Sequence, residues 1–219
     1  MQFNFDLVVN SFPLLLVGAG VTIKITALSV ALGVVIGLFV GIARISRIKL
    51  LRVLAAIYVD FFRGTPLLVQ IFLVYFALPV ITGQRVDPFV AAIGSCGINS
   101  GAYVAEIFRA GIQSIDKGQW EAAKTIGLNY WQTMKEIILP QAFKRVLPPY
   151  INEFIVLIKD SSLLASIGAV ELLHGAQVLG ANYYNYMIPL LCATVMYLVM
   201  TMTISHFARK LERRLAQSD

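Results

Sequence analysis

Polar and ionisable side chains interrupt two otherwise apolar segments of the chain. Asn99, Tyr103 and Glu106 lie in one segment at i, i+4 and i+7, a spacing that places them on one face of a helix. Glu153 and Asp160, at i and i+7, share a helical face in the other segment. A carboxylate is costly in an apolar environment and is a functional candidate there. These residues therefore predict a binding site for a polar solute.

The rise of about 1.5 Å per residue in a helix sets the depth of these side chains. Counted from the start of each segment, Asn99 and Asp160 both lie roughly 16 Å in, near the middle of a bilayer. If the two segments run antiparallel, Tyr103 and Glu153 share a level nearer the cytoplasm. The pattern predicts a polar cavity between the two segments.

Each of these residues also has a purely structural interpretation. Glu106 could pair with Arg109 or Lys159, and Asp160 could cap a break in its helix. Glu153 could be an interfacial anchor, and Asn99 and Tyr103 could form hydrogen bonds between helices.

Thr65 and Pro66 suggest the start of a further helix, with the threonine as N-cap and the proline at the first helical position. The positive end of such a helix could meet a substrate carboxylate, as broken helices do in transporters. The alternative is an ordinary helix start near the cytoplasmic surface.

The elements that position these residues must lie in lipid, because the composition excludes a soluble domain. Hydrophobic residues make up 58% of the chain and charged residues 14%, against about 25% charged residues in soluble domains. The net charge of +6 comes from basic clusters at residues 44–52, 117–145 and 209–214. These clusters separate apolar runs as the positive-inside rule requires, so the charge indicates a membrane protein and no nucleic-acid partner.

Five segments approach the 20 or so apolar residues that cross a bilayer. We expect these spans at residues 22–43, 64–83, 88–110, 149–170 and 187–208. With the basic clusters inside, the N-terminus is outside, the C-terminus is cytoplasmic, and residues 112–147 form a cytoplasmic loop. Residues 50–62 are expected to be an interfacial or re-entrant approach to the second span. The predicted fold is a single all-α integral membrane domain of about five transmembrane helices.

The sequence offers no set of residues for catalysis or metal binding. Cys96 and Cys192 lie far apart in apolar stretches, and His174 and His206 are isolated near span ends. No Gly-Lys pair occurs, so the chain lacks a phosphate-binding loop of the Walker type. We expect a protein that is not an enzyme, and ATP, if it is used, to bind another chain.

Residues 115–142 predict two short helices around Gly127. Gly127 is expected to adopt a left-handed cap conformation, and Asn129 with Gln132 has the spacing of a capping box. Pro140 is expected to close the second helix. Without further information the segment is a helical hairpin between two spans.

This loop resembles the EAA loop of the permease subunits of ABC importers. The resemblance rests on E-A-A at residues 121–123, on Gly127 and on I-L-P at residues 138–140. Four further motifs resemble the polar amino-acid branch of that family. They are RGTP at 63–66, INSGAY at 98–103, EIFRAG at 106–111 and KDSSL at 159–163. The resemblance extends from about Pro13 to Arg214, and it departs at Glu153, where some members carry an amide.

The resemblance implies a type I ABC importer permease in a bacterial inner membrane. It implies two ABC ATPase subunits that bind ATP and magnesium, a second permease copy or a related permease, and an extracytoplasmic amino-acid-binding protein. The residues that it implies for coupling to the ATPase are Glu121, Ala122, Ala123, Gly127, Leu139 and Pro140. The full candidate set for substrate binding is Thr65, Asn99, Ser100, Tyr103, Glu106, Glu153, Leu157 and Asp160.

The separation of the two carboxylates favours a basic amino acid such as arginine, lysine or histidine. Glu153 lies roughly 10 Å along the helix from Asp160, a distance that suits an extended cationic side chain. Glutamine or another polar amino acid is the alternative substrate. A secondary transporter or channel that acts alone, and a membrane-embedded enzyme, are the alternatives from other classes.

Overall fold

The structure is a computed structural model, and it describes residues 5–216 of the chain. These residues are almost entirely helical, which confirms the predicted all-α fold. The α-helices are α1 (Phe5–Ile45), α2 (Lys49–Gly64), α3 (Leu67–Phe72), α4 (Leu78–Thr82), α5 (Pro88–Gln113), α6 (Lys117–Thr125), α7 (Tyr130–Thr133), α8 (Leu139–Asp160), α9 (Leu172–Asn182) and α10 (Met187–Ala216). Two π-helical segments, Leu73–Ala77 and Met134–Ile138, and a 3₁₀ helix, Ser161–Ile167, connect some of them.

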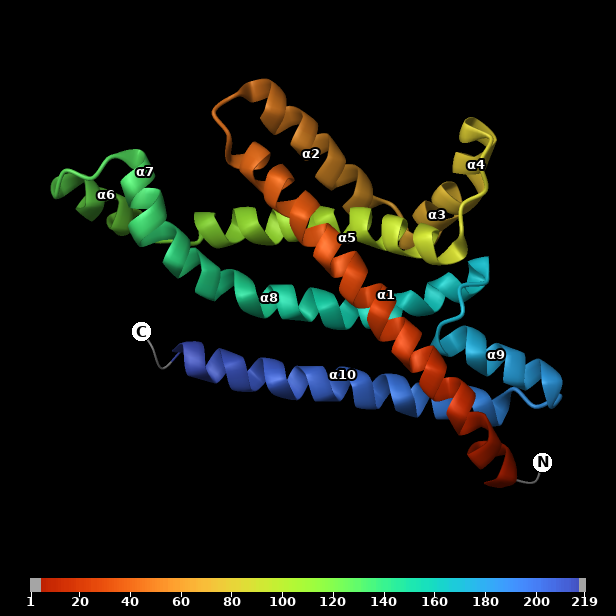
Figure 1. The fold of residues 1–219 in the computed structure, drawn as a ribbon. Helices are drawn as coiled ribbons and strands as arrows, with labels where there is room; N and C mark the ends of the chain where they lie inside the picture. Colours follow the sequence, from red (N-terminus) through yellow and green to blue (C-terminus); the bar gives the residue numbers. More distant parts are fainter. Residues whose placement is uncertain (1–4, 217–219) are drawn as a thin grey trace.

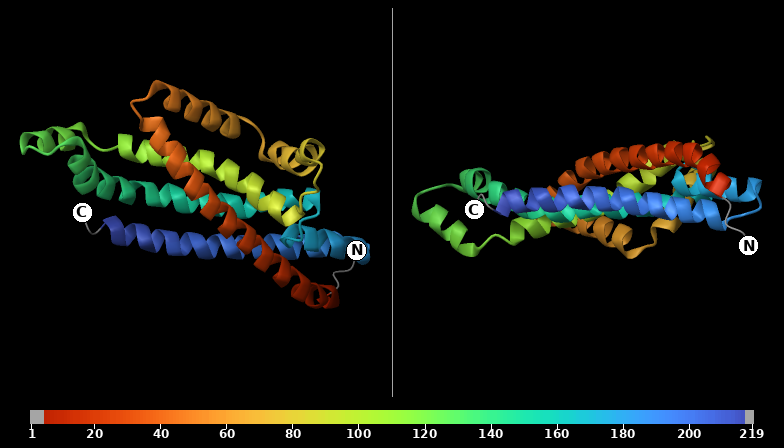
Figure 2. Two further views of the ribbon diagram at one scale, coloured as in Figure 1. Left: turned by 45° about the horizontal axis from the view of Figure 1, so that its top comes forward. Right: turned by 90° about the horizontal axis from the view of Figure 1, so that it is seen from below.

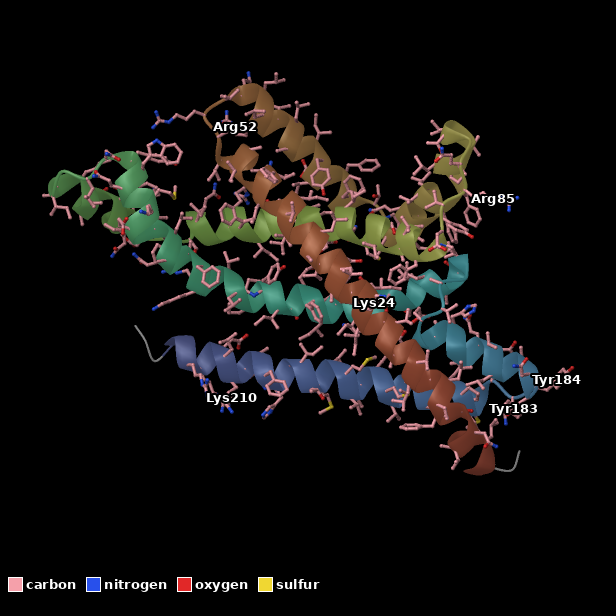
Figure 3. The ribbon with its side chains drawn as sticks, viewed as in Figure 1. Lys24, Arg52, Arg85, Tyr183, Tyr184 and Lys210 are labelled. Carbon is pink, nitrogen blue, oxygen red and sulfur yellow. The ribbon has the colours of Figure 1, made fainter. Side chains whose placement is uncertain are left out.

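The long helices α5, α8 and α10 run side by side, and α1 crosses them obliquely (Figure 1). Seen from other directions, α6, α7 and the end of α10 lie at one end of an elongated body, with α9 at the other (Figure 2). Arg52 and Lys210 lie toward the α6–α7 end, whereas Arg85, Tyr183 and Tyr184 lie at the α9 end (Figure 3).

Glycine residues of α1 allow it to pack closely on α5. A Cβ atom at Gly33 would lie 2.9 Å from the Cβ and Oγ atoms of Ser100, and one at Gly37 would lie 2.5 Å from the Cβ atom of Val104. Both distances are too short for a real contact. Small residues at four-residue spacing bring membrane helices together in this way, because little hydrophobic force acts between helices in lipid.

Two helical stretches are long and apolar enough to cross a membrane, Leu7–Ile45 and Met187–Arg214, within the part of the chain that the structure describes. A third crossing arises if α2 and the stretch Leu67–Thr82, which meet at an angle of 105°, form one broken span. Helices α5 and α8 run antiparallel to each other (Figure 1). The arrangement of five spans stays a prediction.

The start of α1 and both ends of α8, which begins at Leu139, differ from the expected spans by ten residues or more. α1 begins at Phe5 rather than near residue 22, and it continues without a break through Lys24. The Lys24 ammonium lies 5.2 Å from the centre of the Phe89 ring, a contact that helps a helix to carry a lysine at its middle (Figure 3). α8 ends at Asp160 and not near residue 170, and the 3₁₀ helix continues the chain to a left-handed Gly168.

The second expected span is broken near its start. α2 covers the segment that was expected to approach the membrane, and it ends at Gly64. The prediction that Thr65 caps the next helix was wrong, because Pro66 holds the N-cap position in an extended conformation. The Thr65 hydroxyl instead donates to the Phe61 carbonyl, 2.8 Å away, at the end of α2.

The loop helices follow the sequence prediction except at Pro140. Gly127 is left-handed with φ of 83°, and Asn129 and Gln132 form the predicted capping box. Pro140 does not close the second helix, because it lies in the first turn of α8, directly after the π-helical segment. The wider π turn changes the hydrogen-bonding pattern at the point where a proline N–H is missing.

Glu171 joins three helices near the α9 end of the molecule. Its side chain is fully buried and caps α9 by accepting from the backbone N–H groups of Leu173 and His174. The Tyr197 hydroxyl of α10 donates to the same carboxylate over 2.6 Å, and the Thr22 hydroxyl of α1 lies 3.5 Å from it.

Candidate functional site

A polar cavity of about 320 Å³ lies between α5 and α8, beside the break between α2 and α3. This volume is at the lower end of the range of small-molecule sites, about 300–1,000 Å³. The cavity brings together five of the eight residues that the sequence nominated for substrate binding. They are Thr65, Asn99, Tyr103, Glu153 and Asp160.

Two amide side chains hold the break beside the cavity. The Gln70 Nε2 atom donates to the Phe62 carbonyl at 2.9 Å, and to the carbonyl and hydroxyl oxygens of Thr65 at 3.1 and 2.8 Å. Asn99 Nδ2 donates to Gln70 Oε1 at 2.8 Å and to the Phe62 carbonyl at 3.1 Å. Backbone groups freed by a helix break in a membrane need such partners.

Asn99 therefore has a structural role and a free acceptor. Its amide nitrogen is used in the two bonds to the break, and its carbonyl oxygen accepts no hydrogen bond from the residues that the structure describes. Because Asn99 lines the cavity, that oxygen is available to a donor such as an ammonium group.

Glu153 and Asp160 are the two carboxyl groups of the cavity. Glu153 is 8% exposed and Asp160 is partly buried, and within residues 5–216 neither carboxylate forms an ion pair. A carboxylate at low dielectric that has no ion-pair partner attracts a cation strongly. The Arg63 guanidinium lies 5.3 Å from the centre of the Tyr103 ring, and Lys159 directly precedes Asp160 in α8.

Glu106 lies outside this cavity in an ion-pair cluster. Its carboxylate accepts from Arg109, one turn along α5, and from Arg44 of α1 at 3.4 Å. The structure thus supports the pairing of Glu106 with Arg109 rather than with Lys159. Glu106 lines a second cavity of about 440 Å³ that includes Arg63 and Arg145.

The two cavities adjoin along α5 and α8. They share Tyr103, Ile107 and Pro149, and the second extends to Ser114 at the α6–α7 end.

Ser100 and Leu157 do not line the cavity. Ser100 is fully buried, and its side chain occupies the space that a Cβ atom at Gly33 would need. Leu157 is 2% exposed and belongs to the hydrophobic core with Ile25 and Ile71. Both residues serve packing because they lie on faces of α5 and α8 turned toward neighbouring helices.

The six residues nominated for coupling differ in exposure. Glu121, Ala122 and Gly127 are exposed, as are Leu139 and Pro140 in the first turn of α8. Ala123 is fully buried, so it packs the loop rather than presenting a surface.

Sequence reasoning missed several residues at both places. Gln70 and Asn152 belong to the site. For Gln70 the available signal was an amide within an uncharged apolar run, and for Asn152 it was the position directly before Glu153. In the loop, Ile126 and Trp131 are 73% and 77% exposed, which is unusual for large apolar side chains. Their position in a polar loop could have indicated a contact surface.

The family described as "Binding-protein-dependent transport system inner membrane component" matches residues 33–217. The arginine transport system permease protein ArtQ of Bacillus subtilis (strain 168) is 39% identical over 219 residues, which cover 100% of both chains. The glutamine transport system permease protein GlnP of Escherichia coli (strain K12) is 41% identical, covering 98% of this chain and 99% of that protein.

Solved structures give the same result for the fold. A chain from the crystal structure of an amino acid ABC transporter with histidines has a TM-score of 0.94 and 40% identity, covering 98% of this chain and 100% of that one. A chain of the MetNI methionine ABC transporter in an inward-facing conformation has a TM-score of 0.78 at 22% identity, with coverage of 92% and 96%. At that identity the second comparison shows the fold alone.

Proposed function

Because the chain belongs to the family of binding-protein-dependent transport system inner membrane components, and is the permease of an amino-acid ABC importer, we propose that it carries a basic amino acid. The observation behind this proposal is the pair of carboxylates, Glu153 and Asp160, that line one cavity without an ion-pair partner among the described residues. An amino acid with a cationic side chain supplies two positive groups, one for each carboxylate.

Four residues that line the cavity have a role in this proposal. Asp160 accepts the α-ammonium group, and the free carbonyl oxygen of Asn99 accepts from the same group. Glu153, two turns along α8, accepts the distal cation, and Tyr103 closes the cavity with Arg63 behind it. Glutamine is the second candidate, because several relatives are named glutamine permeases.

The remaining parts of the machine follow from the family. ATP hydrolysis lies in a separate subunit, and we propose two such ATPases, which bind ATP and magnesium, with a second permease copy or a related permease. Glu121, Ala122 and Gly127 contact the ATPase, and an extracytoplasmic binding protein delivers the amino acid at the α9 end. In this topology the N-terminus is outside the bacterial inner membrane, and the α6–α7 end and the C-terminus are cytoplasmic.

The test is the change Glu153→Gln in the reconstituted complex, with uptake of arginine, lysine, histidine and glutamine measured in competition. Removing one partner of a buried charge pair costs about 2 kcal/mol or more, which is roughly 30-fold in affinity. We expect uptake of the cationic amino acids to fall by that factor relative to glutamine. The matched control is Glu212→Gln in α10, outside the cavity. Unchanged selectivity in Glu153→Gln would refute the basic substrate.

A further inference from the structure

An apolar groove lies beneath α1 on another face of the α5–α8 pair. α1 crosses α8 near the middle of the molecule and diverges from it toward the α6–α7 end (Figure 1). The space between them holds about 480 Å³. Its apolar walls include Val34 and Leu38 of α1, Val104 and Phe108 of α5, and Phe143 and Val146 of α8.

The groove widens into a second space at the α6–α7 end. This space holds about 590 Å³ and shares Phe108 and Leu139 with the groove, so the two adjoin. It is lined by Ser46 and Arg47, just beyond the end of α1, and by Trp131, which is 77% exposed. An apolar groove that ends in aromatic and basic side chains has the chemistry of a membrane interface.

Arg47, at this end of the groove, has no ion-pair partner in the described part of the chain. The Arg47 guanidinium lies 5.6 Å from the centre of the Tyr130 ring, and it forms no ion pair with any residue among 5–216. Nearby Arg44, by contrast, is paired with Glu106. The groove therefore ends in one unneutralised, exposed guanidinium.

We propose that the groove binds one phospholipid with an anionic headgroup. An acyl chain lies between α1 and α8, and the phosphate lies at Arg47. The length agrees, because α1 rises about 17 Å from Val34 to its end at Ile45, close to the roughly 15 Å of one leaflet of a bilayer. With the topology proposed above, this is the cytoplasmic leaflet. The site is separate from the polar cavity, so it does not depend on the identity of the substrate.

The charge argues for this occupant over a second permease copy. A protein surface seated here would have to bring its own carboxylate to Arg47, whereas an anionic lipid supplies a phosphate at the depth where the guanidinium lies. Basic groups near an anionic membrane surface contribute about 1 kcal/mol each.

The experiment uses the purified permease–ATPase complex and native mass spectrometry. Phosphatidylglycerol and phosphatidylcholine with identical acyl chains are added in turn, and bound lipid is counted. We expect one phosphatidylglycerol per permease. Arg47→Gln should weaken the binding of phosphatidylglycerol about fivefold, which is the factor that one basic group gives. The binding of phosphatidylcholine should not change. Leu38→Trp, which fills the groove, should displace both lipids.

Two matched controls separate a site from the general lipid shell. Arg209→Gln removes a basic residue of α10 at the same end, and Leu198→Trp adds bulk to an exposed position of α10. Neither should change lipid retention, and the same spectra report whether each variant still assembles with the ATPase. Three results would overturn the proposal. The first is that Arg47→Gln retains as much phosphatidylglycerol as the unmodified protein, and the second is that the control variants lose as much lipid as Arg47→Gln and Leu38→Trp do. The third is a crosslink between two permeases through Leu38→Cys.

Discussion

The break between α2 and α3 makes one prediction that can be worked from individual hydrogen bonds. Gln70→Met keeps the length of the side chain and removes its amide, whose two N–H hydrogens are shared among three acceptors on Phe62 and Thr65 and whose oxygen accepts from Asn99. Hydrogen bonds between membrane helices contribute about 0.6 kcal/mol each on average, so the loss of three such bonds is about 1.8 kcal/mol. We expect the free energy of unfolding of the permease to fall by that amount.

The measurement is unfolding of the purified permease in mixed micelles with increasing SDS. Gln84→Met, an exposed glutamine in the loop before α5, is the matched control and should unfold as the unmodified protein does. Because Gln70 also fixes the amide of Asn99, the variant should raise KM for the amino acid more than it lowers kcat. A Gln70→Met protein within 0.5 kcal/mol of the unmodified one would show that the amides do not hold the break, and the reasoning would fail.

Three further predictions concern packing, coupling and topology. Gly37→Leu should destabilise the permease by about 2 kcal/mol in the same unfolding assay, since the new side chain must displace Val104, whereas Gly37→Ala should cost less. Gly127→Val should destabilise the permease by about 1–2 kcal/mol and lower the amount of ATPase that co-purifies. The cost comes from backbone strain at φ of 83° alone, since no atom lies near the Cβ position. Gly127→Asn should retain the ATPase, because asparagine tolerates a left-handed conformation. Cysteines at Gln84 and Lys117 should react with impermeant reagents from outside and from the cytoplasm respectively; labelling from one side alone would refute the five-span topology.

The positions of the polar residues were predictable because helix periodicity is regular. Asn99, Tyr103, Glu153 and Asp160 do line one cavity, as spacing and depth had indicated. The partner of Asn99 was not predictable. Gln70 lies at the far side of a helix break, and no local spacing relates the two residues.

Helix ends were harder to place than helix faces. Composition placed the start of the first span near residue 22, yet α1 begins at Phe5 and is not interrupted by Lys24, an exposed lysine that contacts an aromatic ring. Proline rules failed at Pro140, because a π-helical turn before it changes the bonding pattern that the missing N–H would disturb. Both errors arose where tertiary surroundings override a local rule.

The buried carboxylate of Glu171 limits how this permease can change shape. α1, α9 and α10 meet at that one side chain, and separating any of them would leave a desolvated charge with fewer partners. A buried polar group that loses its hydrogen-bond partners costs about 1–3 kcal/mol. A rearrangement that keeps α1, α9 and α10 together around Glu171 avoids this cost, whereas one that separates any of them does not.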